Sequence, residues 1–317
     1  MELATARLGV ALRRLGQPPT LPRAAPSPSA RLARVITLYE YEASPYCKRV
    51  REAVCALGLS VRIKPCPRTT LLREGEVGTR WRAEARALTP PEQPLRFPLL
   101  HDEPALGSSG EPAIVPESLA CVAHLWTHYG DSGAGLAEVQ GWVERVRSRA
   151  ERVRPFVPGG RTTRLRNFVN LVSDEDLPGL FAASVARPFG HAGLAAAAAA
   201  RTAQPDVFHD SERALWADEA CPHARLVREA LCSLGLSYTL HGMGGAGRGD
   251  HESTATAAAQ AQAAALRAAH GEDARPPFLV DPRLGVHSCA GEHAVRGLWK
   301  VYHGGPLPAL LHLFSRE

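Results

Sequence analysis

The 317-residue sequence predicts an α/β chain in which one unit of alternating strands and helices occurs twice. The main observation is that the stretch Leu38–Ser60 recurs in altered form at Leu215–Ser237, 177 positions later. Within it, VREAVCALGLS and VREALCSLGLS differ at only two positions, too few for a chance match. A second observation is that both units end alike, in Leu-Trp followed by Tyr129 or Tyr302. We therefore expect a tandem duplication in which each unit closes its own core.

In the first unit, residues 34–130, hydrophobic periodicity predicts the order βαβαββα. Ser44 is a typical N-cap and Gly58 a typical residue just after a helix end, so the first helix lies between them. On this helix an apolar stripe would face the core, while Arg51 and its charged neighbours would face water. The strands are expected at Val35–Tyr39, Val61–Ile63, Leu95–Leu100 and Ala113–Val115, and the later helices at Glu76–Leu88 and Glu117–Tyr129.

The second unit, residues 212–304, repeats this order. Its helices are expected at Pro222–Leu234, Ser253–Ala269 and Cys289–Tyr302, and its strands at Ala214–Trp216, Ser237–Leu240, Pro277–Val280 and Gly285–His287.

Three segments fall outside the two units. Residues 1–33 are rich in Arg, Pro and Ala with Glu2 as the only acid, which suits either an organelle transit peptide or a Pro-rich arm of the mature protein. Residues 131–211 are expected to form a connector of short helices and irregular structure. Residues 305–317 form a C-terminal tail.

Composition excludes several function classes. The net charge is only +5 and no Lys/Arg block carries interleaved aromatic residues, which argues against nucleic-acid binding. No apolar run approaches the roughly 20 residues of a transmembrane helix. The seven cysteines form no CxxC pair and no Cys/His cluster with zinc spacing, so we expect no metal site and a reducing compartment.

A βαβ half followed by ββα, with a proline opening the third strand and a CxxC-type turn opening the first helix, resembles the thioredoxin fold. It is most similar to glutaredoxins and to the N-terminal domain of glutathione transferases. More narrowly, YEYEASPYCKRVREA followed by PCPR resembles the tandem proteins of plastid-bearing organisms that carry two such domains. The resemblance covers about 34–130 and 212–304. It implies two tandem thioredoxin-like domains joined by a partly helical connector, glutathione as substrate, and a chloroplast location.

The resemblance also implies site residues in the first unit. In glutaredoxins the first Cys of the turn, at a helix N-terminus where its pKa is lowered, attacks disulfides, and the second Cys resolves the mixed disulfide. Here Ser44 occupies the attacking position and Cys47 the resolving one, with Tyr46 between them. Pro98 matches the cis-proline that pairs with the glutathione backbone, and Glu117-Ser118 match the pair that binds its γ-glutamyl end.

In the second unit the turn is Cys221-Pro222-His223-Ala224, so the attacking thiol is present and the resolving one is absent. Pro277 matches the cis-proline, but Ala290-Gly291 replaces the acid–Ser pair. Cys221 is therefore the best candidate for thiol chemistry. Cys55 and Cys232 occupy the same helix position in both copies, which favours core packing over redox use.

Three functions follow as alternatives. The first is a redox protein in which unit one binds glutathione and Cys221 forms a mixed disulfide with glutathione or a protein thiol. In a sharper form, the Ser44–Cys47 and Cys221–Ala224 turns are halves of one divided dithiol site, which requires the two turns to meet. The second is a glutathione transferase in which Ser44 activates the thiol. The third is a non-catalytic binding or scaffold module.

Overall fold

The computed structural model describes residues 34–42, 44–66, 80–105, 110–130, 137, 139–141, 143–144, 213–219, 221–244, 257–288 and 291–303. The arm at 1–33, nearly all of the connector and the tail at 305–317 lie outside the described residues, and so do Cys289 and Ala290. No described helix combines the length and the hydropathy that a membrane span requires.

The first unit has the predicted order of elements. It runs β1 (Arg34–Glu40), α2 (Pro45–Ala56), β2 (Ser60–Pro65), α3 (Arg80–Leu88), β3 (Leu99–Pro104), β4 (Ala113–Pro116) and α4 (Ser118–Tyr129). The third strand is displaced from the prediction, because it runs Leu99–Pro104 instead of Leu95–Leu100. Ladder pairing with β1 starts only after Pro98, at Leu99 opposite Tyr39, and a proline cannot donate to such a ladder.

The second unit repeats the order. It runs β5 (Ala214–Ala217), α8 (Pro222–Leu234), β6 (Tyr238–Gly242), α9 (Ala257–His270), β7 (Phe278–Asp281), β8 (Gly285–Ser288) and α10 (Gly291–His303).

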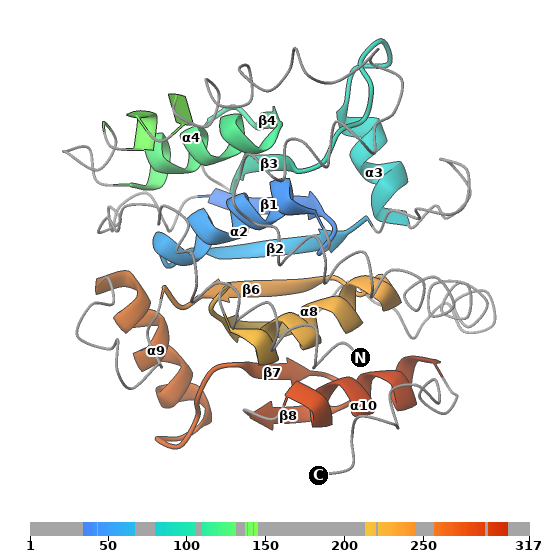
Figure 1. Ribbon diagram of the computed structural model, residues 1–317, viewed down its shortest axis with the longest axis vertical. Coiled ribbons are helices and arrows are strands. Elements are labelled where there is room, and N and C mark those ends of the chain that lie inside the picture. Colours follow the sequence, from blue (N-terminus) through green and yellow to red (C-terminus); the bar gives the residue numbers. More distant parts are fainter. Residues whose placement is uncertain are drawn as a thin grey trace, which may run out of the picture.

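The two units share one eight-stranded sheet with the order β4-β3-β1-β2-β6-β5-β7-β8 (Figure 1). They join where β2 and β6 pair antiparallel, and Arg62 lies opposite Thr239 at the middle of this pairing. On either side the register is symmetric under the 177-residue spacing, so the units are related by an approximate two-fold axis through that pair. The flanking partners are Val61 with Leu240 and Ile63 with Tyr238.

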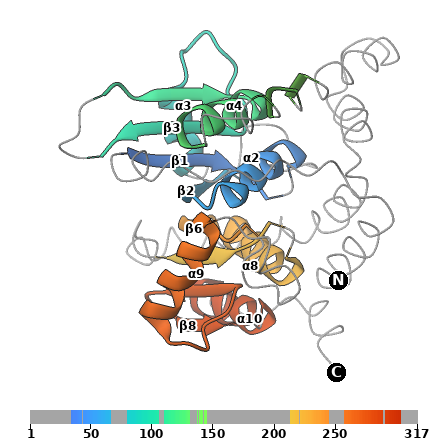
Figure 2. The same cartoon turned by 90° about the vertical axis from the view of Figure 1, so that its left-hand side faces the viewer.

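The main hydrophobic core is common to both units, which corrects the expectation that each unit closes its own core. A single cluster of buried side chains gathers α2 and α4 together with α8 and α10, and Figure 2 shows these four helices stacked along one side of the sheet. Two smaller clusters lie under α3 and α9. Pairing two edge strands brought the apolar faces of both units together, and a local sequence pattern carries no sign of that contact.

Each unit also covers the end of the other unit's first helix. The indole Nε1 of Trp81 on α3 donates to the carbonyl oxygen of Gly235, just after α8, at 3.0 Å. In the reciprocal contact, Gln262 on α9 donates to the carbonyl oxygen of Gly58, just after α2, at 3.2 Å. Gly58 has a φ of +58°, and a Cβ there would lie 2.8 Å from the Cβ of Ala258. Only glycine meets both demands.

Candidate functional site

The turn that opens α2 is closed around its own capping bond. Ser44 is the N-cap, as predicted, and its Oγ accepts a hydrogen bond from the amide of Cys47 at 3.2 Å. Ser44 is only 1% exposed and Cys47 is fully buried. Burial, with Glu40 adding to it, raises the pKa of the Cys47 thiol to about 12. Cys47 is therefore a protonated, inaccessible thiol at neutral pH.

The equivalent turn of unit two is more open. Cys221 is the N-cap of α8, but its side chain makes no capping bond. Among the cysteines that the structure describes, Cys221 is the one that is not buried. The Nδ1 atom of neighbouring His223 is buried without a hydrogen-bond partner within the described part of the chain. Ala224, which replaces the resolving cysteine, is fully buried.

Both predicted cis-prolines are present, because the peptide bonds Phe97–Pro98 and Pro276–Pro277 are cis. Each proline comes directly before a strand, β3 or β7. The carbonyl oxygen of Pro98 accepts a hydrogen bond from the amide of Glu117 at 3.1 Å. This bond brings the start of α4 next to the cis-proline. No hydrogen bond between the Phe97 backbone and another backbone group is found among the described residues.

Glu117 has an unusual backbone conformation, with φ +74° and ψ 136°. Within the described residues it is the one non-glycine residue with a positive φ. It is the N-cap of α4, yet its side chain makes no capping bond. Its carboxylate pairs instead with exposed Arg96 at 2.5 Å. Sparsely populated backbone conformations of this kind cluster at ligand sites, which makes Glu117 a candidate for ligand binding.

Ser118, the first residue of α4, is buried beside Glu117. Unit one thus collects a serine, a carboxylate and the amide end of a helix at one point. In unit two the equivalent position of Glu117 lies outside the described residues, and α10 begins with Gly291, which offers no side chain.

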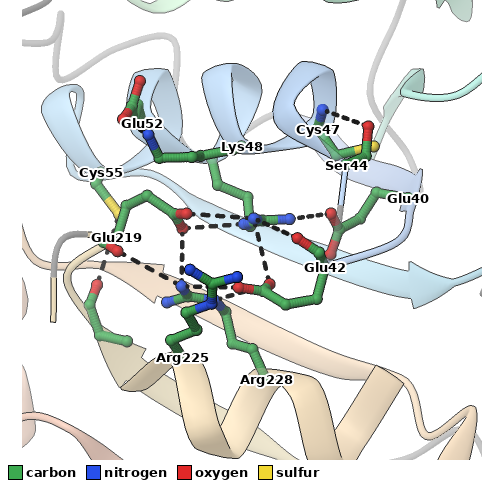
Figure 3. A network of polar contacts seen from close by, with 12 residues as sticks. Glu40, Glu42, Ser44, Cys47, Lys48, Glu52, Cys55, Glu219, Arg225 and Arg228 are labelled. Carbon is green, nitrogen blue, oxygen red and sulfur yellow. Dashed lines mark hydrogen bonds and ion pairs between the residues drawn. The ribbon is translucent and has the colours of Figure 1, made fainter. Parts of the chain in front are cut away.

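Buried charged groups fill the joint between the units (Figure 3). Arg51 of α2 donates to Glu219 through Nε at 2.9 Å and Nη2 at 3.2 Å. Arg228 of α8 donates to Glu42 through Nε and Nη2, both at 3.0 Å. Arg51 Nη1 also bonds Glu40. Arg51 and Arg228 are each only 1% exposed.

This network corrects the prediction that Arg51 faces water. The residue pattern of α2 predicts which face of the helix is polar. In the folded chain, unit two packs against that polar face. A signal was present in the sequence, because Arg51 and Arg228 as well as Glu42 and Glu219 are 177 positions apart. A symmetric joint is formed when each unit supplies one arginine and one glutamate at equivalent positions, so that each arginine meets the glutamate of the other unit.

Glu40 and Glu219 of the network have pKa values shifted in opposite directions. Burial, together with Glu42 and Glu219, raises the pKa of Glu40 to about 7, against the opposing effect of Arg51. Burial alone would also raise the pKa of Glu219, but Arg228 and Arg51 outweigh it and lower that pKa to about 2. Glu219 is therefore a carboxylate at neutral pH, while Glu40 is poised between its two forms.

The structure does not bring the two turns together. Cys55 Sγ donates to the carbonyl oxygen of Ala217 at 3.6 Å, so the far end of α2 lies beside the segment that leads into Cys221. Figure 3 shows Ser44 and Cys47 at one end of the network and Glu219 at the other. Cys47 is about 12 Å along the helix from Cys55, whereas a disulfide needs Cα atoms within roughly 7 Å. The geometry thus gives the divided dithiol hypothesis no support.

Comparison with known families matches the glutathione S-transferase N-terminal domain to residues 38–133. The matched residues are those of unit one. Comparison with curated proteins finds no match. Within the part that the structure describes, no group of three or more His, Cys, Asp or Glu side chains could hold a metal ion.

Two solved structures are also similar, both of maleylacetoacetate isomerase from Anaeromyxobacter dehalogenans 2CP-1. One, with bound GSH in the active site, is 21% identical, covers 63% of this chain and 82% of its own, and has a TM-score of 0.24. The other, with bound dicarboxyethyl glutathione and citrate, is 19% identical, covers 63% and 81%, and has a TM-score of 0.24. Scores this low assign no function.

Proposed function

We propose that the chain is a glutathione-linked protein of two thioredoxin-like domains, in which unit one binds glutathione and unit two carries the reactive thiol. The family match supports the first domain. The second has the same element order, the same strand order and its own cis-proline, and we extend the fold to it on these grounds.

The observation that carries glutathione binding is the geometry at Glu117 and Ser118. The γ-glutamyl end of glutathione has one carboxylate and one ammonium group. Its carboxylate suits the start of α4, where the helix dipole is positive and the Ser118 hydroxyl can donate. Its ammonium suits the Glu117 carboxylate, and the backbone of Phe97 suits the cysteinyl peptide.

Ser44 would act on the glutathione sulfur as a hydrogen-bond donor once the turn around it opens, because its side chain is only 1% exposed in this structure. Its Oγ already accepts the Cys47 amide bond, which leaves the hydroxyl hydrogen for a ligand. Tyr46, half-buried on the same turn, has the guanidinium of Arg49 5.5 Å from its ring centroid. With Cys47 buried, unit one would bind glutathione without forming a disulfide, and a transferase activity would depend on Ser44.

Cys221 would perform monothiol exchange, because it is partly exposed and Ala224 offers no resolving thiol. The Cys221 thiolate attacks one sulfur of glutathione disulfide or of a protein disulfide. A new bond forms to that sulfur, and the other sulfur leaves as a thiolate. A glutathione thiolate then attacks the mixed disulfide and frees Cys221. Pro277 would lie beside the bound peptide.

Calorimetric titration with S-methylglutathione tests the binding site, since this analogue cannot take part in exchange. We expect Glu117→Gln and Ser118→Ala each to weaken binding about tenfold, the loss of one hydrogen bond to a charged group. Glu92→Gln, an exposed acid of the same unit, is the control. No heat of binding with the unaltered chain, or equal binding by all variants, would refute the site.

Intact-mass analysis after exposure to glutathione disulfide tests the thiol. We expect one glutathionyl adduct on Cys221, absent from Cys221→Ser and removed by reduced glutathione. An adduct that persists in Cys221→Ser would assign the chemistry to another cysteine.

We also propose a chloroplast address for residues 1–33, supported only by their composition. These residues fused to a fluorescent protein should direct it into chloroplasts of plant cells. Fluorescence that stays in the cytosol would contradict this proposal.

A further inference from the structure

Each proposed site is held by an arginine of the other unit. Glu219 comes two residues before Cys221, and its two-bond partner is Arg51 of unit one. Glu42 comes two residues before Ser44, and its two-bond partner is Arg228 of unit two. The pairs that use both nitrogens of the guanidinium fork therefore cross the joint in both directions.

The crossed pairs are built to fix position. A planar guanidinium that meets a carboxylate through two parallel bonds sets orientation as well as distance. All four side chains are buried, so water cannot replace a lost partner. Each turn also has one backbone bond that reports its closure. The amide of Cys221 donates to Asp218 O at 3.1 Å, and the amide of Ser44 donates to Tyr41 O at 3.0 Å.

We propose that Arg51 positions the Cys221 turn and Arg228 positions the Ser44 turn, so that each site is complete only with the other unit docked. The proposal rests on the function given above for its biological meaning, but not for its geometry. It makes the four residues of the crossed pairs positioning residues, since their paired side-chain bonds join them to one another and not to the Cys221 or Ser44 side chain.

Weaker contacts join the crossed pairs into one network. Arg51 Nη2 lies 3.2 Å from Glu42, and Arg228 Nη2 lies 3.2 Å from Glu219. A shift of Glu42 that follows ligand binding near Ser44 changes what Arg228 can offer to Glu219. The two sites are thereby coupled, and the coupling is reciprocal because it is a free energy shared by both.

Hydrogen exchange of the full chain, followed by mass spectrometry, tests the crossed arrangement without any ligand. Arg51→Lys and Glu219→Gln should speed exchange in the peptide covering 218–222 more than in that covering 41–45. Arg228→Lys and Glu42→Gln should show the reverse. Arg267→Met, which removes an exposed contact of α9 at 4.0 Å, should change neither peptide. The lysine variants keep the charge, which favours a folded chain.

One pattern of exchange would overturn the proposal. If each variant loosens only the turn of its own unit, or both turns equally, arginine does not position the opposite site. Urea unfolding of every variant separates such local opening from a general loss of stability.

The rate at which a thiol reagent modifies Cys221 tests whether the position of the turn affects its reactivity. Cys221 should react about fivefold faster in Arg51→Lys than in the unaltered chain, the factor expected for losing one hydrogen bond in the turn. An unchanged rate would refute the positioning role. If Arg51→Lys opens the Cys221 turn but no glutathione binds the unaltered chain, the proposed function fails while this inference stands.

Discussion

Glu40 adds a third buried carboxylate to the joint, and this leads to a measurable dependence of stability on pH. The crossed pairs balance two arginines with two carboxylates. Glu40 is the extra acid, because its counterpart 177 positions later is Ala217. Burial raises its pKa to about 7, whereas the ordinary value is 4.5. We predict that Glu40→Gln stabilises the chain at alkaline pH.

The sign of this pH effect follows from the linkage between proton binding and folding. A carboxyl group whose folded-state pKa is raised binds its proton more tightly in the folded chain than in the unfolded one. Its contribution to stability is fully present below pH 4.5 and is lost as the pH rises through about 7. At about 1.4 kcal/mol for each pH unit, the loss is on the order of 3 kcal/mol. Glutamine resembles the protonated acid and escapes this loss.

Urea unfolding at pH 5 and pH 8 measures the effect. The variant should exceed the free energy of unfolding of the unaltered chain by less than about 1 kcal/mol at pH 5 and by about 3 kcal/mol at pH 8. The difference between the two proteins is the quantity to use, because burial lowers the pKa of His241 to about 4. That histidine gives an opposite pH dependence below pH 6.5, and it is common to both chains.

The control is Glu92→Gln, which alters an exposed acid and should leave the free energy of unfolding the same at both pH values. A Glu40→Gln difference that is equal at pH 5 and pH 8 would show that Glu40 does not hold an extra proton. A less stable variant at pH 8 would show that the Glu40 carboxylate strengthens the network.

Three further predictions concern stability and access. Because the core is common to both units, urea unfolding should give one transition that coincides for far-ultraviolet dichroism and tryptophan fluorescence; two separated transitions would refute a joint core. Asp102→Asn should lower the free energy of unfolding by about 2 to 4 kcal/mol, as the buried Asp102 carboxylate accepts bonds from Arg34, His124 and Tyr129; a loss below 0.5 kcal/mol in urea would contradict this. Peptide mapping after brief maleimide treatment should find Cys221 modified before any other described cysteine, and equal modification of the buried ones would show that the core opens readily.

Local patterns predicted the elements of this fold well, because caps and turns are local devices. Ser44 caps α2, Gly58 follows its end, and the prolines at 98 and 277 open their strands, all within a few residues of the signals that predicted them. Sequence signals within a single strand or helix were enough to predict these features.

The joint and the site needed contacts that no local pattern contains. The polar face of α2 predicts water around Arg51, and only the partner unit turns that face into an interior. The positive φ of Glu117 is equally invisible, since glutamate has no preference for it. What the sequence did contain was the repetition of Arg51 and Glu42 in the second copy, which indicates a symmetric role without revealing the partner.

The pairing of β2 with β6 also determines which strands of the sheet have unpaired edges that other proteins could contact. An unpaired edge strand offers free amides and carbonyls that can template aggregation. Among the described strands the outer positions fall to β4 and β8, each four residues long, and β4 ends in a proline. Separated units would instead expose β2 and β6, with Ile63 and Tyr238 on them. The β2–β6 pairing thus covers the two longer edge strands, which would aggregate more readily, and leaves the short strands β4 and β8 at the outside of the sheet.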